Sequence, residues 1–238
     1  MTVPISETEN STQTSLNHDA GDRLRSIRES LAAALTEAGR AEDTVEIVAI
    51  SKKHTVETVE PALRAGHRVF GENRVQEAKE KWPTLRDAYP DISLHLVGPL
   101  QSNKVKDAVD VFDLIETVDR EKIARALKTE MDRVGRHLPC LVQVNIGQEE
   151  QKSGIDPTSA DEFIRYCSQD LSLDVAGVMC IPPNDEPPAP YFALLKKIAD
   201  RNALRTVSMG MSGDYEIAAQ LGATHVRVGS AIFGPRPT

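Results

Sequence analysis

A lysine at the end of an apolar segment is the first residue of this chain whose setting suggests chemistry. Lys52 ends the run VEIVAISK, which begins at Val45. Burial favours the neutral amine, and a neutral lysine amine can form a Schiff base with an aldehyde. Lys53 follows directly, and because consecutive strand residues point to opposite faces, only one of the two can enter a site. The pattern leaves open which one does so, and also whether the lysine simply reaches solvent.

Two segments near the end of the chain are typical of phosphate-binding loops. Met211, Ser212 and Gly213 follow the run TVSMG, and Gly229 and Ser230 follow HVRV. Such loops, beside a helix start, offer the N–H groups and hydroxyls that a phosphate requires. Glycine and serine are also common turn residues, so either segment alone is weak evidence. The two together favour a phosphate site.

Arg227 lies inside HVRV between two valines, so its side chain belongs to the opposite face of that strand. A buried arginine stays charged and requires an acceptor, which is either a structural carboxylate or a ligand atom. A lysine, a phosphate site and an inward arginine together meet the needs of pyridoxal 5′-phosphate (PLP), with the arginine at the ring nitrogen. An arginine there does not favour a protonated ring, which makes the ring a weak electron sink.

The segments that must position these residues alternate between short apolar runs and stretches with helical spacing. Several of the runs are almost continuously apolar, as in parallel strands buried on both faces. Asp156 followed by Pro157 predicts the start of one of the helices. Eight such units predict a (β/α)8 TIM barrel, with a doubly wound open sheet as the alternative. The predicted strands are VEIVAIS, HRVFG, SLHLVG, VFDLIET, LVQVNI, DVAGVMCI, TVSMG and HVRVG.

An extra helix is predicted before the first strand. Its apolar residues share one helical face, and a glycine follows as the stop signal. Residues 1–18 are rich in Ser, Thr, Asn and Glu, which predicts a disordered N-terminal tail. We expect residues 19–238 to form the barrel as one domain. The helix residues are Leu24, Ile27, Leu31, Leu35 and the stop Gly39.

The composition narrows the class of protein. The 238 residues carry 28 Lys and Arg against 36 Asp and Glu, a net charge of -8. This is the wrong sign for binding nucleic acid or an anionic membrane. The three cysteines are widely separated, which predicts neither a metal site nor a disulfide framework. Because the sequence shows no leader and no apolar stretch of membrane-spanning length, we expect a cytoplasmic protein. We also expect this protein to be a monomer.

Six segments, taken in order, resemble the pyridoxal phosphate homeostasis protein family: AISKKH, FGENRVQE, HLVGPLQSNK, SGI, MGMSGD and VRVGSAIFG. The resemblance runs from about Leu24 to Gly234. It implies a barrel like the N-terminal domain of alanine racemase and one bound PLP. It implies a Schiff base on Lys52, Asn73 near the ring hydroxyl and Arg227 at the ring nitrogen. It also implies a phosphate site lined by Ser212, Gly229 and Ser230, with backbone groups from Met211 and Gly213.

Three functions fit these residues. The resemblance implies a PLP carrier, not an enzyme, that holds the cofactor and releases it to PLP-dependent apo-enzymes, with no catalytic residue of its own. The alternative is a PLP-dependent amino acid racemase, which requires an acid or base on each face of the substrate. The third is a barrel enzyme for a phosphorylated metabolite, without PLP. His95 is either a ligand contact or a core histidine, and Glu116 either a base or a solvated loop residue.

Overall fold

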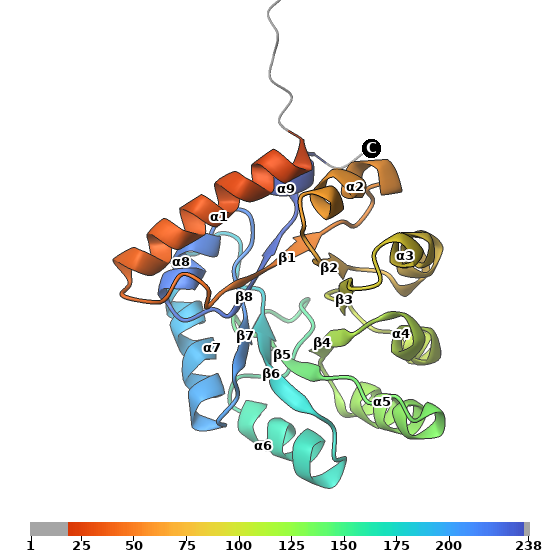
Figure 1. Cartoon of the computed structure of the whole chain (residues 1–238). Coiled ribbons are helices and arrows are strands. Elements are labelled where there is room, and N and C mark those ends of the chain that lie inside the picture. The colour runs from red at the N-terminus through yellow and green to blue at the C-terminus, as the bar shows by residue number, and fades with distance from the viewer. Residues whose placement is uncertain (1–18, 236–238) are drawn as a thin grey trace, which may run out of the picture.

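The apolar runs form eight parallel strands that close into one barrel (Figure 1). The computed structural model describes residues 19–235. Each strand pairs with the next along the chain, and β8 returns to pair with β1. This confirms the (β/α)8 barrel over the open sheet, whereas the predicted tail at residues 1–18 lies outside the described residues. The strands are β1 Glu46–Ile50, β2 Val69–Glu72, β3 Ser93–Leu96, β4 Leu114–Val118, β5 Cys140–Val144, β6 Val175–Cys180, β7 Thr206–Ser208 and β8 His225–Val228.

Helices alternate with the strands and lie around the outside of the barrel (Figure 1). A 3-10 turn, Ser102–Lys104, precedes α4, and a π-helical turn, Tyr166–Asp170, continues α6. No helix among residues 19–235 has both the length and the apolar character needed to cross a bilayer. The helices after the strands are α2 Val56–Arg64, α3 Val75–Ala88, α4 Val105–Val111, α5 Glu121–Val134, α6 Ala160–Arg165, α7 Ala189–Arg201, α8 Tyr215–Gln220 and α9 Ser230–Phe233.

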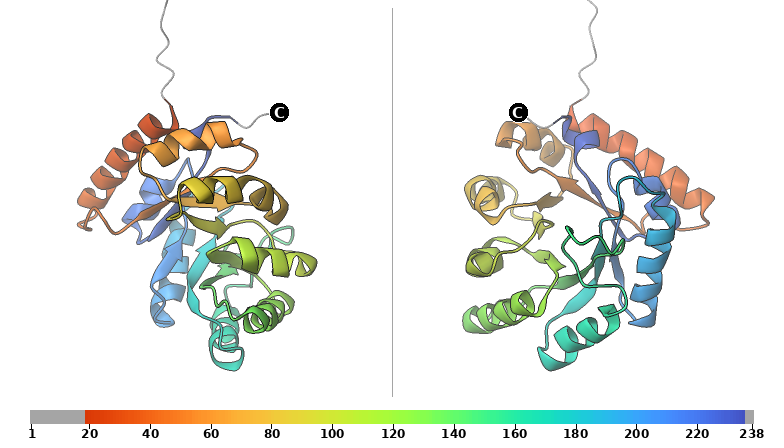
Figure 2. Two further views of the ribbon diagram at one scale, coloured as in Figure 1. Left: turned by 45° about the vertical axis from the view of Figure 1, so that its right-hand side comes forward. Right: turned by 180° about the vertical axis from the view of Figure 1, so that it is seen from behind.

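The predicted extra helix is α1, Ala20–Glu37, which begins at the side-chain cap of Asp19 and is followed by Gly39 at φ 67°. Its predicted apolar face is buried. The helix lies beside α8 and α2 (Figure 1), and among residues 19–235 the helix that follows β8 is the four-residue α9. The start of α1 also lies beside α9 in the views of Figure 2, and Arg23 Nη1 donates to the Ile232 carbonyl at 3.2 Å.

Alternation along the strands separates an outer core from the barrel interior. Val226 and Val228 belong to the large core between strands and helices, whereas Arg227 points inward, as predicted. Inside the barrel two small apolar clusters are separate from the outer core. Polar side chains occupy the rest of the interior. The members of the two clusters are Val48, Ile50 and Val97, and Leu114, Leu141 and Met179.

The predicted helix start at Asp156 is wrong by one turn. The helix α6 begins only at Ala160, after Ser159. The Asp156 carboxylate instead accepts hydrogen bonds from the backbone N–H and the hydroxyl of Thr158. Asp156 therefore closes a local turn that precedes the helix, because an aspartate caps such turns with the same hydrogen bond that it offers to a helix.

Candidate functional site

A cavity of about 300 Å³ opens at the end of the barrel where the strands finish. Parallel strands bring the loops after their C-terminal ends together at this face. The lining residues come from the ends of β1, β2, β3, β6, β7 and β8 and from the loops that follow them. All the residues that the sequence indicated for the site are among them. The lining consists of Ile50, Lys52, His54, Asn73, Val97, Ile181, Met211, Ser212, Gly213, Arg227, Gly229 and Ser230.

The two adjacent lysines after β1 take different directions. Lys52 is partly buried and lines the cavity, whereas Lys53 is exposed on the surface. Lys53 has a left-handed backbone with φ 64°, and its N–H donates to the Glu77 carboxylate. A left-handed residue redirects the chain within one residue. Lys52 is therefore the amine that the fold presents to the cavity.

The two predicted phosphate-binding segments meet at one side of the cavity. The Gly229 N–H donates to Ser212 Oγ at 3.3 Å, which joins the loop after β7 to the loop after β8. The Met211 N–H already donates to the Asp214 carboxylate at 2.6 Å. Among residues 19–235, the N–H groups of Ser212 and Gly213 have no acceptor. This side of the cavity thus offers two backbone donors and two hydroxyls, a set suited to an oxyanion.

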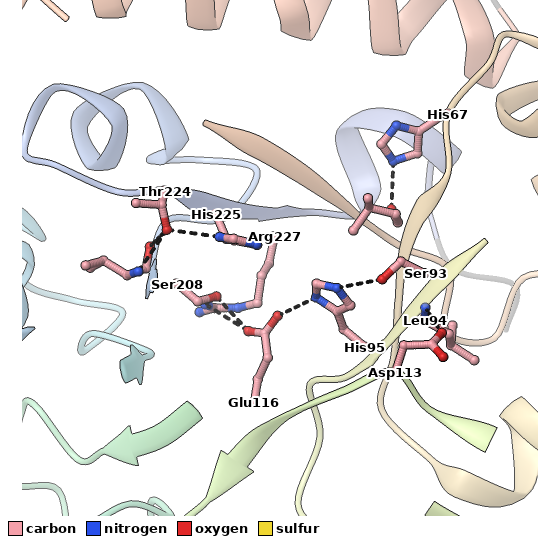
Figure 3. A network of polar contacts seen from close by, with 12 residues as sticks. His67, Ser93, Leu94, His95, Asp113, Glu116, Ser208, Thr224, His225 and Arg227 are labelled. Carbon is pink, nitrogen blue, oxygen red and sulfur yellow. Dashed lines mark hydrogen bonds and ion pairs between the residues drawn. The ribbon is translucent and has the colours of Figure 1, made fainter. Parts of the chain in front are cut away.

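Arg227 is held by acceptors inside the barrel while it lines the cavity (Figure 3). Its Nη1 donates to Ser208 Oγ at 2.7 Å, and its Nη2 donates to the Cys180 carbonyl at 2.7 Å. The Glu116 carboxylate lies 4.0 Å from Nη1 and accepts from the Ser208 hydroxyl at 2.6 Å. Of the two acceptors that the sequence left open, the structural carboxylate is present, since Glu116 balances the charge of Arg227. The guanidinium also borders the cavity, where a ligand atom would meet it.

The alternative of Glu116 as a solvated loop residue is wrong. It belongs to β4, is fully buried, and accepts from His95 Nδ1 at 2.9 Å (Figure 3). Burial alone would raise the pKa of Glu116, but the hydrogen bond and charge of His95, the Arg227 charge and the Ser208 hydroxyl together lower it. His95 is therefore a core histidine that orients Glu116. The sequence signal for a buried Glu116 was its position as a charged residue inside the apolar run VFDLIET.

Close backbone contact fixes the position of Asn73 at the cavity wall. A Cβ atom on Gly98 would lie 2.2 Å from the Asn73 carbonyl oxygen. The loop after β3 therefore packs directly on the loop after β2 because residue 98 has no side chain. Among the polar lining residues, His54 is the one that the sequence did not single out, and its ring packs on Phe233 with centroids 5.4 Å apart. The apolar lining residues Ile50, Val97 and Ile181 were not singled out either.

Comparison with known proteins places this barrel among relatives of similar length. Residues 23–237 match the model of the alanine racemase N-terminal domain. The pyridoxal phosphate homeostasis protein of Aquifex aeolicus is 36% identical over 227 residues, covering 92% of this chain and 99% of that protein. The protein of that name from Vibrio cholerae is 37% identical, covering 90% of this chain and 94% of its own length.

Solved structures share the fold. PipY of Synechococcus elongatus with PLP bound is 33% identical with a TM-score of 0.77, covering 91% of this chain and 100% of that one. Alanine racemase of Clostridium difficile, 16% identical with a TM-score of 0.66, shares the barrel over 89% of this chain and 57% of its own. These matches confirm the resemblance seen in the sequence. The chain belongs to the pyridoxal phosphate homeostasis protein family, whose barrel is that of the alanine racemase N-terminal domain.

Proposed function

We propose that this chain binds PLP in the cavity at the barrel mouth, as a Schiff base on Lys52, and holds it for release to PLP-dependent apo-enzymes. The observation that carries the proposal is the convergence of a lysine amine, a set of oxyanion donors and a buried arginine on one cavity of about 300 Å³. The name shared by the curated relatives and the PLP-bound structure of PipY support it.

The residues present fit the cofactor. PLP supplies an aldehyde carbon that an amine attacks reversibly with loss of water. Lys52 provides that amine from the turn after β1. In the same cavity, the loops after β7 and β8 would bind the phosphate through hydroxyls and N–H groups. Asn73 lies at the cavity wall, where it would bind the ring hydroxyl. The proposed phosphate ligands are Ser212, Gly213 and Ser230, with Met211 and Gly229 shaping the two loops.

Arg227 makes the site a poor place for carbanion chemistry. The guanidinium stays charged and can only donate hydrogen bonds. Its contacts with Ser208, Cys180 and the nearby Glu116 fix it beside the cavity. A ring nitrogen that accepts from it remains unprotonated, so the ring withdraws electrons weakly. This favours storage of the cofactor over turnover of amino acids.

A racemase is the alternative, and one feature of the cavity favours it. Racemisation needs an acid or base on each face of the substrate α-carbon. The titratable side chains among the described lining residues are Lys52, His54 and Arg227. Lys52 would serve one face, which makes His54 the candidate for the other. A variant with His54→Phe separates the two functions, because a carrier does not need an acid at that position.

Borohydride reduction tests the binding site. Purified protein incubated with PLP should show a visible absorption band that disappears on reduction. Peptide mapping should then find the pyridoxyl group on Lys52. Lys52→Arg should lose the label, and the control Lys53→Arg should keep it, because Lys53 is exposed. A label on Lys53 in the native protein, or no label, would contradict the proposal.

The function itself is tested by two assays on the same loaded protein. We expect it to reactivate a PLP-dependent apo-enzyme and to give negligible deuterium incorporation at the α-carbon of free amino acids. Rapid deuterium exchange that requires both Lys52 and His54, without reactivation of the apo-enzyme, would establish the racemase and refute the carrier.

A further inference from the structure

A second buried lysine lies beneath the turn that carries Lys52. Lys81 belongs to α3, and its side chain is 6% exposed. Its Nζ donates to the Ser51 carbonyl at 2.7 Å and to the His54 carbonyl at 2.9 Å. It also lies 2.6 Å from Glu72 Oε1. An ammonium has three N–H donors, so these three short contacts account for all of them.

Glu72 is the buried counter-charge of this lysine. It ends β2 and is 0% exposed. Its Oε1 also accepts from Ser51 Oγ at 2.7 Å and from Trp82 Nε1 at 3.1 Å. Burial raises the pKa of Glu72, and the Lys81 charge opposes that rise. The carboxylate thus binds one end of the turn directly and keeps Lys81 in place for the other end.

The two carbonyls that Lys81 binds bracket the lysine pair. Ser51 precedes Lys52, and His54 follows Lys53, with the His54 N–H donating back to the Ser51 carbonyl at 3.1 Å. Within the turn, Lys53 is left-handed and its N–H donates to the Glu77 carboxylate, also on α3. Side chains of α3 therefore hold both ends and the middle of the turn. Nothing in the strand β1 itself would select Lys52 over Lys53.

We propose that Lys81 is a positioning residue for the proposed PLP site, on whose existence this inference rests. Lys81 does not line the cavity. Its ammonium holds the carbonyls of Ser51 and His54 so that the Lys52 amine enters the cavity and the Lys53 amine faces solvent. Loss of these two hydrogen bonds lets the turn change conformation, and the adjacent Lys53 then competes for the aldehyde.

The test compares three variants with the unaltered protein. Lys81→Met removes the ammonium, but it leaves Glu72 buried without its counter-charge and can prevent folding. The double variant Lys81→Met with Glu72→Gln removes both charges and retains the shape of the pair. Lys79→Met is the matched control, because Lys79 lies on the same helix with its side chain 39% exposed.

Two readouts separate positioning from general destabilisation. After PLP addition and borohydride reduction, we expect the pyridoxyl group on Lys52 alone in the unaltered protein and in the control. In the folded double variant we expect it on both lysines, with PLP affinity at least tenfold lower. Hydrogen exchange should accelerate in the peptide covering residues 51–55, with exchange in the rest of the barrel unchanged.

Label on Lys52 alone at unaltered affinity in the folded double variant would overturn the inference. So would unchanged exchange of residues 51–55. If the unaltered protein itself takes no PLP on Lys52, the proposed function fails. The exchange measurement on PLP-free protein then still decides whether Lys81 fixes the turn, since it requires no cofactor.

Discussion

Replacing Gly98 with alanine should move one wall of the cavity. The added Cβ would lie 2.2 Å from the Asn73 carbonyl oxygen and 2.6 Å from its Cα, both backbone atoms that no rotamer change can remove. The loops after β2 and β3 would have to separate by about 0.8 Å to reach a contact of 3.0 Å. Overpacking of this kind costs about 1–3 kcal/mol, and each kcal/mol lowers Tm by roughly 2–4 °C in a chain of this size.

The same displacement should weaken PLP binding, because Asn73 moves with its loop. Loss of one hydrogen bond costs about 0.5–1.5 kcal/mol, which is roughly a two- to tenfold rise in Kd. Gly177→Ala is the matched control. Its Cβ would lie 2.0 Å from the Thr206 carbonyl oxygen, a comparable clash at the start of β7, away from the cavity. Calorimetry and PLP titration of both variants should show lower Tm in both and weaker binding only in Gly98→Ala. Equal affinity in the two variants would refute the reasoning.

Three further outcomes follow from the site and the core. Ser212→Ala and Ser230→Ala should each weaken PLP retention about tenfold or more in equilibrium dialysis, because a hydroxyl bond to a charged phosphate contributes about 1.5–3 kcal/mol. Full retention of PLP in the double variant would place the phosphate elsewhere. Burial lowers the pKa of His67 and of His225 to about 4, so the unfolded chain binds protons that the folded chain does not between that pH and about 6.5. Stability should therefore fall as pH drops from 7 to 5, by about 2 kcal/mol for each histidine, and urea unfolding of His67→Gln should show a shallower dependence than the unaltered protein. The three cysteines are buried, and burial raises the pKa of each thiol to about 12, so iodoacetamide at pH 8 should alkylate unfolded but not native protein.

The order of apolar and polar residues along the chain predicted which side chains of a strand or helix face the core. Arg227 could be assigned to the barrel interior because the valines on either side belong to the outer core. The spacing of apolar residues likewise predicted α1 and its burial. Parallel pairing then brings the ends of the strands to one face, so loop order predicted that Lys52 and the loops after β7 and β8 would line one cavity. Asn73 was expected there only from the family resemblance.

Other features required contacts between distant residues. The choice between Lys52 and Lys53 depends on a left-handed turn held by α3, where the two-residue alternation of a strand no longer applies. Glu116 and Arg227 meet across the barrel, and only the register of the closed sheet brings them within 4.0 Å. No pattern within either strand specifies that partner.

The position of α1 and the pairing of β1 with β8 affect how the chain folds during its synthesis on the ribosome. The first strand has one neighbour, β2, until the last strand has left the ribosome, because β8 begins only at His225. Until then, the nascent chain exposes an unpaired strand edge, and α1 lacks α9, which follows β8. Pairing over so long a sequence separation is slow, and exposed edges promote aggregation. A chain truncated before His225 should therefore accumulate as a chaperone substrate, because the barrel can close only after β8 has emerged and paired with β1.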